Sequence, residues 1–363
     1  MAQVDLDRLQ AAIGEIADPH TGQTLAAAKS VAGVDADGGR ISLRLSLGYP
    51  AAGWHQALAA QIDQVAAGVP GVEAVAVDIT TRVIPHQVQK TLQRMQGIKN
   101  IIVVASGKGG VGKSTTSANL ALALAAEGAS VGLLDADIYG PSQPRMMGIS
   151  GNPESADGKT IEPMRNYGVQ CMSIGFLIDE EQPMVWRGPM VTQALEQLLR
   201  DTRWEDLDYL VIDMPPGTGD TQLTLSQKVP VAGALIVTTP QDIALLDARK
   251  GLEMFKKVEV PVLGIVENMS THICSSCGHE EHIFGAGGGA AMAADCGVEL
   301  LGSLPLDIRI REQADGGRPT VVAEPDSAIA AAYREIARKM AGRLAVRARD
   351  YSGSFPKIVI QNT

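Results

Sequence analysis

Cysteine and aromatic residues are scarce in this sequence. The chain has 4 cysteines among 363 residues, and aromatic side chains make up 4% of it. Four unevenly spaced cysteines in a chain of this length do not form the disulfide framework of a small secreted domain. With so few aromatic rings, the core has to be packed mainly by Ala, Val and Leu side chains. These shortages favour a reduced protein with an aliphatic core.

Long apolar runs and an excess of basic residues are also missing. The best apolar run, VPVAGALIV from Val229, is about half of the ~20 residues that a membrane span needs. The net charge of −10 makes a uniformly acidic surface a poor partner for nucleic acid or an anionic membrane. The first ten residues contain early acids and no signal-type apolar stretch. We therefore expect a cytoplasmic protein that targets neither nucleic acid nor membrane.

The first eighty residues have a pattern of their own. Apolar residues at helical spacing predict helices over 5–17 and 53–67, and strict alternation in RISLRLSL predicts a strand over 40–47. Strands are also expected over 30–34 and 72–79. The order α-β-β-α-β predicts a small α+β domain over residues 1–80, built as an antiparallel sheet with helices packed against it.

The rest of the chain changes character. Residues 81–100 are polar and Gln-rich and are interpreted as a linker, with room for a short helix. From residue 101 onward, short apolar runs without alternation are separated by helical segments, a pattern typical of strands buried on both faces of a parallel sheet. We predict a doubly wound, mostly parallel α/β domain over 101–345 and a tail over 346–363.

One segment of this second domain predicts phosphate binding. GKGGVGKS follows the predicted strand IIVVAS and precedes a helical run, so it matches G-x-x-x-x-G-K-[ST] in the right context. Glycine N–H groups can surround phosphate oxygens, and the helix N-terminus adds a positive dipole end. Lys113 should contact the β- and γ-phosphates, and the Ser114 hydroxyl should bind Mg²⁺. The predicted binding residues are Gly107, Lys108, Gly109, Gly110, Val111, Gly112, Lys113, Ser114 and Thr115.

A second lysine narrows this prediction. With Lys108 the loop reads K-G-G-x-G-K-[ST], and it resembles the deviant Walker A loop of MinD/ParA ATPases, the arsenite pump ATPase and the nitrogenase iron protein. In that family the extra lysine contacts the nucleotide of the partner subunit. The resemblance therefore implies that ATP is held between two copies of this chain, in a homodimer, with Lys108 reaching across.

Acidic residues end two further apolar strands. In a doubly wound sheet, ligand groups lie at the carboxyl ends of the strands. Asp213, in LVIDMPPGTGD, is the expected Walker B carboxylate for Mg²⁺-bound water. Asp137, in LLDADIYGPS, resembles the switch I aspartate that orients the attacking water. Its neighbour Asp135 looks more like a residue that supports Mg²⁺ or the loop.

Two more residues are assigned by the same resemblance. Asn268, at the end of GIVENM, matches the position at which this family reads the adenine base through a side-chain amide. Asp247, in ALLDARK, resembles the acid that pairs with the signature lysine at the dimer interface. A solvated position on a helix face is the simpler interpretation of Asp247.

Cys274 and Cys277 form a C-x-x-C motif with three histidines nearby, in THICSSCGHEEHIF. A thioredoxin-like redox pair does not suit this position in the chain. Two interpretations stay open: a zinc site completed by two of the histidines, and two thiolates per chain that a second copy completes to hold a 4Fe–4S cluster. Cys171 and Cys296 stand alone and are left out of the site.

Taken together, these motifs resemble the Mrp-type iron–sulfur cluster carriers, which are related to eukaryotic cytosolic cluster scaffolds. The front domain, with its DPHTG segment, resembles a small domain found in iron–sulfur assembly proteins. The resemblance implies ATP binding, slow hydrolysis, and transfer of a labile cluster to apoprotein acceptors. The front domain contains no cysteine, so a cysteine-based role there does not carry over. The matching segments are SGKGGVGKST, DADIYGPSQPRMMG, VWRGPM, DMPPGTGD, TTPQDIALLDARK, ENMS with the C-x-x-C, and GSLPLD.

Two other functions share parts of this pattern, a positioning ATPase and an electron-transfer ATPase. A MinD/ParA-like positioning ATPase with a structural zinc at the C-x-x-C is disfavoured by the negative charge and by the motif itself. An electron-transfer ATPase like the nitrogenase iron protein also shares a cluster between subunits, but its cysteines are single and far apart in sequence. The cluster carrier is the function that the sequence favours.

Overall fold

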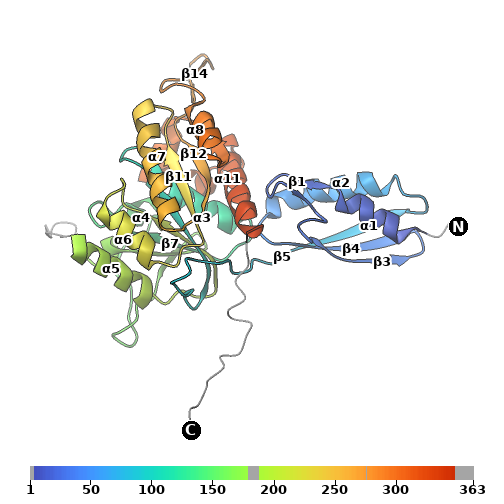
Figure 1. The fold of residues 1–363 in the computed structure, drawn as a ribbon, viewed down its shortest axis with the longest axis horizontal. Helices are drawn as coiled ribbons and strands as arrows, with labels where there is room; N and C mark the ends of the chain where they lie inside the picture. Colours follow the sequence, from blue (N-terminus) through green and yellow to red (C-terminus); the bar gives the residue numbers. More distant parts are fainter. Residues whose placement is uncertain (1–3, 179–187, 275, 348–363) are drawn as a thin grey trace, which may run out of the picture.

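The computed structural model describes residues 4–178, 188–274 and 276–347. The first half of the segment VWRGPM and nearly all of the predicted tail lie outside the described residues. The described chain forms a small domain beside a larger one, and a hairpin extends from the larger domain beyond its helices (Figure 1). Within the described residues, no helix has both the length and the apolar character that crossing a bilayer requires.

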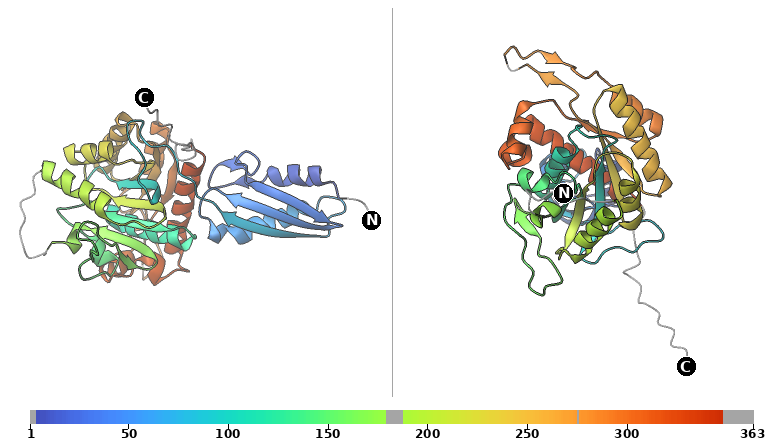
Figure 2. Two further views of the ribbon diagram at one scale, coloured as in Figure 1. Left: turned by 90° about the horizontal axis from the view of Figure 1, so that it is seen from below. Right: turned by 90° about the vertical axis from the view of Figure 1, so that its left-hand side faces the viewer.

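The small domain has the predicted element order with one added ribbon. Strand β4 alternates as expected, because Ile41, Leu43 and Leu45 are fully buried while the residues between them are exposed. Helices α1 and α2 lie over the sheet and bury Leu9 and Leu58 in the same core (Figure 2). The elements are α1 (Leu6–Gly14), β1 (Ala17–Asp18), β2 (Gln23–Thr24), β3 (Val31–Asp37), β4 (Arg40–Leu47), η1 (Ala52–Trp54), α2 (His55–Ala66) and β5 (Ala74–Thr81).

The prediction of an antiparallel sheet in this domain is wrong for one of its two strand pairs. Strands β3 and β4 are antiparallel, but β4 and β5 are parallel over their whole length. The reason is the connection: α2 lies between β4 and β5 in the chain, and a helical crossover returns the chain to the same end of the sheet before the next strand begins.

The segment between the domains packs on the larger one. It contains no helix over residues 82–97, all of which are described, and β6 begins at Ile98, inside the expected linker. Gln89 is buried, donates hydrogen bonds to the carbonyls of Ser226 and Val229, and accepts one from the Val231 N–H. These contacts tie the segment to the end of α6 (Asp220–Lys228).

The larger domain is a doubly wound α/β fold, as predicted. Its eight-stranded sheet has the order β15-β12-β11-β6-β10-β7-β9-β8, and every pair except β8–β9 is parallel. Helices cover both faces (Figure 2). The sheet strands are β6 (Ile98–Ala105), β7 (Val131–Asp135), β8 (Met164–Asn166), β9 (Val169–Ser173), β10 (Leu207–Asp213), β11 (Gly233–Thr238), β12 (Val262–Glu267) and β15 (Leu300–Ser303).

The remaining elements are helices and one short ribbon. They are α3 (Lys113–Ala126), α4 (Gln143–Met146), η2 (Ile174–Phe176), α5 (Gly188–Asp201), α6 (Asp220–Lys228), α7 (Asp242–Lys257), β13 (His272–Ile273), β14 (Glu280–Glu281), α8 (Gly288–Cys296), α9 (Ile308–Asp315), α10 (Thr320–Ala323) and α11 (Ala328–Ala345). The C-x-x-C motif falls between β13 and β14, which pair as an antiparallel hairpin.

A buried polar network joins the two domains. His20 of the small domain lies 3.2 Å from both a Glu335 carboxylate oxygen and the Arg338 Nε on α11. Arg338 also pairs with Glu127 at 2.8 Å, and Glu127, which follows α3, accepts a hydrogen bond from the Gly53 N–H. Charged groups at a buried boundary persist only when each has a partner, so this network fixes how the small domain sits on α3 and α11.

We predict that the stability conferred by His20 falls as the pH rises. Burial alone would lower the pKa of His20, but hydrogen bonds to Asp18 and Glu335 raise it above its ordinary value of 6.5. The protonated form is therefore favoured in the folded chain, so its contribution is complete below pH 6.5 and is lost as the pH rises through the raised pKa. His20→Ala should lower the free energy of unfolding by about 1 kcal/mol near pH 6 and by less near pH 9.

Thermal unfolding of both proteins across that pH range checks this prediction. His55→Ala is the control, because burial lowers the pKa of His55 and its effect should change with pH in the opposite direction. A destabilisation by His20→Ala that grows with pH would contradict the assignment.

Candidate nucleotide site and metal-binding hairpin

The predicted phosphate-binding loop joins β6 to α3 at the carboxyl edge of the parallel sheet. Gly110 and Gly112 have φ angles of +79° and +81°, a left-handed conformation that side chains disfavour. The side chain of Val111 between them is buried. At Gly107 the loop touches α7, where an added Cβ would lie 2.1 Å from the Asp247 backbone. These contacts explain why the loop needs glycine at these positions.

Lys113 and Asp213 form the central contact of the site. The Lys113 ammonium lies 2.6 Å from one Asp213 oxygen and 3.0 Å from the Ser114 hydroxyl. The side chains of Lys113 and Asp213 are 6% and 0% exposed. Parallel strands bring β6 and β10 to the same edge, so the loop lysine meets the acid that ends the neighbouring strand. Lys113 and Asp213 were both predicted from the sequence as site residues, and the structure brings them together.

Two further polar residues contact this pair, and the sequence analysis did not single them out. The Ser117 hydroxyl donates to the same Asp213 oxygen that Lys113 contacts, at 2.8 Å. The Gln143 side-chain amide donates to the other Asp213 oxygen and to the Ser114 carbonyl, both at 3.0 Å. Ser117 lies one helical turn after Lys113, a spacing that could have suggested it. Gln143 stands within DADIYGPSQPRMMG, where no spacing rule points to it.

Asp135 organises the loop that follows β7. Its carboxylate accepts hydrogen bonds from the backbone N–H groups of Asp137, Ser142 and Gln143. Burial and the nearby Asp213 charge raise the pKa of Asp135 to about 7. Burial also raises the pKa of Asp137, with a further contribution from Asp213. These contacts match the interpretation of Asp135 as a support for the loop.

The donor set at this edge suits Mg²⁺. Three acidic side chains, Asp135, Asp137 and Asp213, lie near a single buried lysine, so the site has more acidic groups than basic ones. Among the described residues, the buried Ser142 hydroxyl and the Gln143 side-chain carbonyl oxygen have no hydrogen-bond partner. Mg²⁺ prefers oxygen ligands and carboxylates. The residues present therefore fit this ion, with Ser114 and Asp213 as its predicted protein contacts.

Lys108 is part of the loop, and Asp247 lies on α7, which touches the loop at Gly107. Within one chain the two side chains do not form an ion pair with each other. The Asp247 carboxylate pairs with Lys250, 2.9 Å away on the same helix. Within the part of the chain that the structure describes, Lys108 has no ion-pair partner, and its side chain is half-buried. The role of both residues across a dimer stays a prediction.

Asn268 contacts the phosphate-binding loop directly. Its side-chain N–H donates to the Val111 carbonyl at 2.9 Å, and the residue is 7% exposed. The predicted role was adenine recognition through the amide. The contact with Val111 uses one of the two N–H groups of that amide and leaves its oxygen available to accept a hydrogen bond. Asn268 therefore lies against the phosphate-binding loop, while its contact with the base stays a prediction.

Cys274 and Cys277 lie at the tip of the β13–β14 hairpin. Cys274 donates its N–H to the His279 carbonyl and accepts at its own carbonyl from Gly278, whose φ is +71°. Cys274 is half-buried and Cys277 is exposed. Backbone N–H groups of Ser276 and Cys277 point at the Cys274 sulfur and lower its pKa, which favours the thiolate that metals bind. Cys171, by contrast, is buried in β9, and burial raises the pKa of its thiol.

The histidines near the motif support the hairpin base. The Nδ1 atoms of His272 and His282 lie about 3 Å from the carbonyls of Leu306 and Ser270. A carbonyl only accepts hydrogen bonds, so each Nδ1 carries the proton. No group of three or more His, Cys, Asp or Glu side chains suited to a metal ion occurs within residues 4–178, 188–274 and 276–347.

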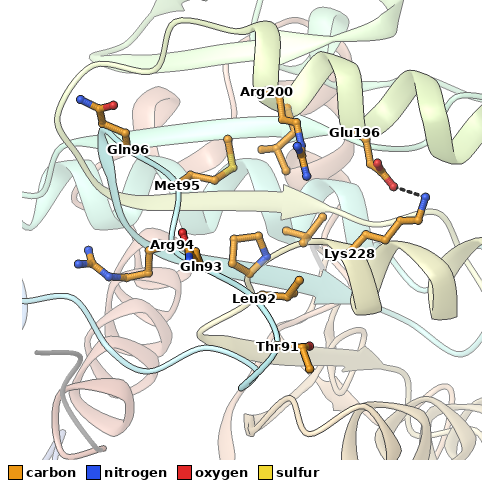
Figure 3. Close-up of a pocket in the computed structure, with 12 residues that line it drawn as sticks. Thr91, Leu92, Gln93, Arg94, Met95, Gln96, Glu196, Arg200 and Lys228 are labelled. Carbon is orange, nitrogen blue, oxygen red and sulfur yellow. Dashed lines mark ion pairs between the residues drawn. The ribbon is translucent and has the colours of Figure 1, made fainter. Parts of the chain in front are cut away.

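A pocket elsewhere in this domain has different chemistry. It lies between residues 91–96, α5 and α6, and has a volume of about 430 Å³ (Figure 3). Arg94, Arg200 and an ion pair between Lys228 and Glu196 line it. Residues 91–96 precede β6, so the pocket adjoins the amino end of that strand. Ligands of doubly wound sheets bind at the carboxyl ends, where the phosphate-binding loop lies.

Comparison with protein families supports both parts of this description. Residues 97–341 match the family described as NUBPL iron-transfer P-loop NTPase. Residues 6–79 match the family described as iron-sulfur cluster assembly protein. The first match includes the phosphate-binding loop, the acids after β7 and β10, and the cysteine hairpin.

Curated relatives point the same way. An iron-sulfur cluster carrier protein of Pseudomonas fragi is 63% identical over 74% of this chain and 94% of its own length. The protein of that name from Escherichia coli K12 is 54% identical over 80% of each chain. The iron-sulfur cluster transfer protein NUBPL of Mus musculus is 55% identical over 73% of this chain and 82% of its own.

Solved structures show the same fold. A nucleotide-binding protein from Archaeoglobus fulgidus in complex with ADP aligns with a TM-score of 0.57 and 38% identity, covering 64% of this chain and 91% of its own. The cell division ATPase MinD of Pyrococcus furiosus aligns with a TM-score of 0.51 and 25% identity, covering 66% of this chain and 98% of its own. Because residues 97–341 match the family in sequence, and the fold and the phosphate-binding loop agree with that match, the chain belongs to the family of NUBPL iron-transfer P-loop NTPases.

Proposed function

We propose that this protein carries a 4Fe–4S cluster and transfers it to apoprotein acceptors, with ATP binding and slow ATP hydrolysis at the phosphate-binding loop. The observation that carries the proposal is the placement of Cys274 and Cys277 together on a hairpin that begins four residues after Asn268, which contacts that loop. The names of the curated relatives support a carrier role.

In this proposal the nucleotide site uses residues from four strand ends. Lys113 and the loop N–H groups bind the phosphates, and the Asn268 amide oxygen accepts from the adenine amino group. Asp137 orients the attacking water. Mg²⁺, held by Ser114 and Asp213, neutralises charge on the phosphates when it is bound. The buried Lys113–Asp213 pair supports this assignment, since it holds together the two residues that must act on one phosphate group.

The cluster is the cargo, and two chains hold it. Each chain supplies two thiols, and a 4Fe–4S cluster is commonly held by four. Lys108 is an independent reason to propose a dimer. The resemblance to the deviant Walker A family implies that this lysine contacts the nucleotide bound to the partner subunit. ATP would close this homodimer through Lys108 and Lys113 and change the geometry around the thiol pairs. The cluster would then pass to an acceptor when the dimer opens.

The exposed tip of the hairpin suits such a transfer. Cys277 is exposed, and Ile273 on β13 and Ile283 just after β14 are 58% and 52% exposed. An apoprotein can therefore approach the sulfur atoms directly. The same features disfavour a positioning ATPase with a structural zinc, because a structural zinc site is normally closed by four protein ligands. We propose that the protein works in the cytoplasm, without a nucleic acid or membrane target.

We expect Lys113→Ala to leave cluster binding intact and to slow ATP-dependent delivery. Loss of the lysine removes the phosphate contact, so ATP hydrolysis should fall by about 100-fold or more. Delivery is followed by the recovery of activity in a cluster-dependent acceptor enzyme, with and without ATP. Lys99→Ala, which removes a surface lysine paired with Asp208, is the control. If the Lys113 variant delivered the cluster at an unchanged rate, ATP would have no role in cluster transfer.

We also expect Cys274→Ser and Cys277→Ser each to abolish cluster retention, while Cys171→Ser retains it. The measurement is iron, sulfide and zinc per chain, with a visible spectrum, on protein purified without oxygen. One shared cluster corresponds to about two irons and two sulfides per chain. One zinc per chain without sulfide would make the hairpin a structural site and would contradict the carrier function.

A further inference from the structure

The strand end that bears Asn268 contacts both the nucleotide site and the root of the cysteine hairpin. Asn268 donates to the Val111 carbonyl at 2.9 Å, and its amide nitrogen lies only 2.1 Å from where a Cβ on Gly112 would be. Its own N–H is held by the Thr238 carbonyl at 2.7 Å. The backbone hydrogen bond to Thr238 therefore holds the Asn268 side chain in contact with the phosphate-binding loop.

The Asn268 contact sets the direction of a phosphate-binding donor. The Val111 carbonyl and the Gly112 N–H belong to one planar trans peptide, in which the two groups point in opposite directions. A hydrogen bond that holds the carbonyl toward Asn268 therefore fixes the Gly112 N–H on the opposite side. A phosphate that accepts from that N–H polarises the peptide and strengthens the bond to Asn268 in return.

The neighbours of Asn268 hold both ends of the hairpin. On one side, the Glu267 carboxylate accepts from the Gly289 N–H at 2.6 Å, at the start of α8, which follows the hairpin in the chain. On the other side, the Ser270 carbonyl lies 2.9 Å from the His282 Nδ1, and the Ser270 hydroxyl and N–H both bond to the Leu304 carbonyl. Residues 267–270 thus fix the base from which the hairpin extends.

We propose that Asn268 is the positioning residue that couples the nucleotide site to the cysteine hairpin, so that occupancy of the phosphate-binding loop changes the exposure of the two thiols. This inference rests on the proposed nucleotide site and names the route by which it acts on the cargo site. The route consists of the Val111–Gly112 peptide, the Asn268 amide and the backbone of residues 267–270. The coupling is reciprocal, because it is a difference in free energy between linked states.

The test uses cluster-free protein and the labelling rate of Cys277 by a small thiol reagent, resolved by peptide mass spectrometry. In the parent chain, saturating Mg²⁺ and ATP should change this rate by about fivefold or more. Asn268→Ala also loses the proposed contact with adenine, so its labelling is measured at an ATP concentration shown by a fluorescent ATP analogue to saturate this variant. At that concentration its labelling rate should not change. The matched control is Asn119→Ala, because Asn119 is also buried and donates to a carbonyl in the first turn of α3, but its other contact leads to α10.

A second variant separates the hydrogen bond from the packing. Asn268→Asp keeps the shape of the side chain but has no N–H to donate, so it should also lose the nucleotide effect on labelling. The proposal is overturned if labelling of the parent chain ignores ATP, or if both variants respond as the parent does. Asn268→Asp keeps an oxygen for the adenine contact, so an Asn268→Asp protein that cannot be saturated with nucleotide would also overturn it, because the Val111 contact would then only hold the loop together. Failure of the carrier function would appear separately, in the iron and sulfide content.

Discussion

The buried pair between Lys113 and Asp213 is the contact on which the nucleotide site depends. Either charge alone would be costly at this depth, since the pair is almost fully shielded from water. Ser117 and Gln143 fill the remaining positions on the carboxylate, and Gln143 also binds the backbone of Ser114. The pair therefore holds the helix that begins at the loop, the end of β10 and the loop after β7 in one arrangement.

Most of the architecture could be predicted from the sequence because the dominant signals are local. Apolar runs without alternation marked β6, β7, β10, β11 and β12, and strict alternation marked β4. The direction of β5 was missed, since pairing direction depends on the connection through α2 and not on the strand's own residues. The edge strands β8 and β15 were also missed, because three or four residues give too short a pattern to read.

In the candidate site, too, local patterns were predictable and contacts between distant residues were not. A contiguous motif identified the phosphate-binding loop and the cysteine pair, and strand ends identified Asp135, Asp137 and Asp213. Contacts that depend on side chains meeting across the fold could not be predicted. Gln143 reaches Asp213 from 70 positions away, and Asn268 reaches Val111 from 157. No spacing in the sequence encodes such pairs; they exist only because parallel strands end at one edge.

The polar character of the boundary between the two domains has a consequence for modularity. Glu127 and Arg338 form an ion pair with each other. On the side of the small domain, the Gly53 N–H donates to Glu127, and the His20 ring lies 3.2 Å from the Arg338 Nε. If the small domain were removed, water could solvate both charges, and the pair would become an ordinary surface ion pair of small energetic weight. An apolar boundary would instead leave a patch that promotes aggregation. These two charges would therefore need no new partner if the small domain were absent.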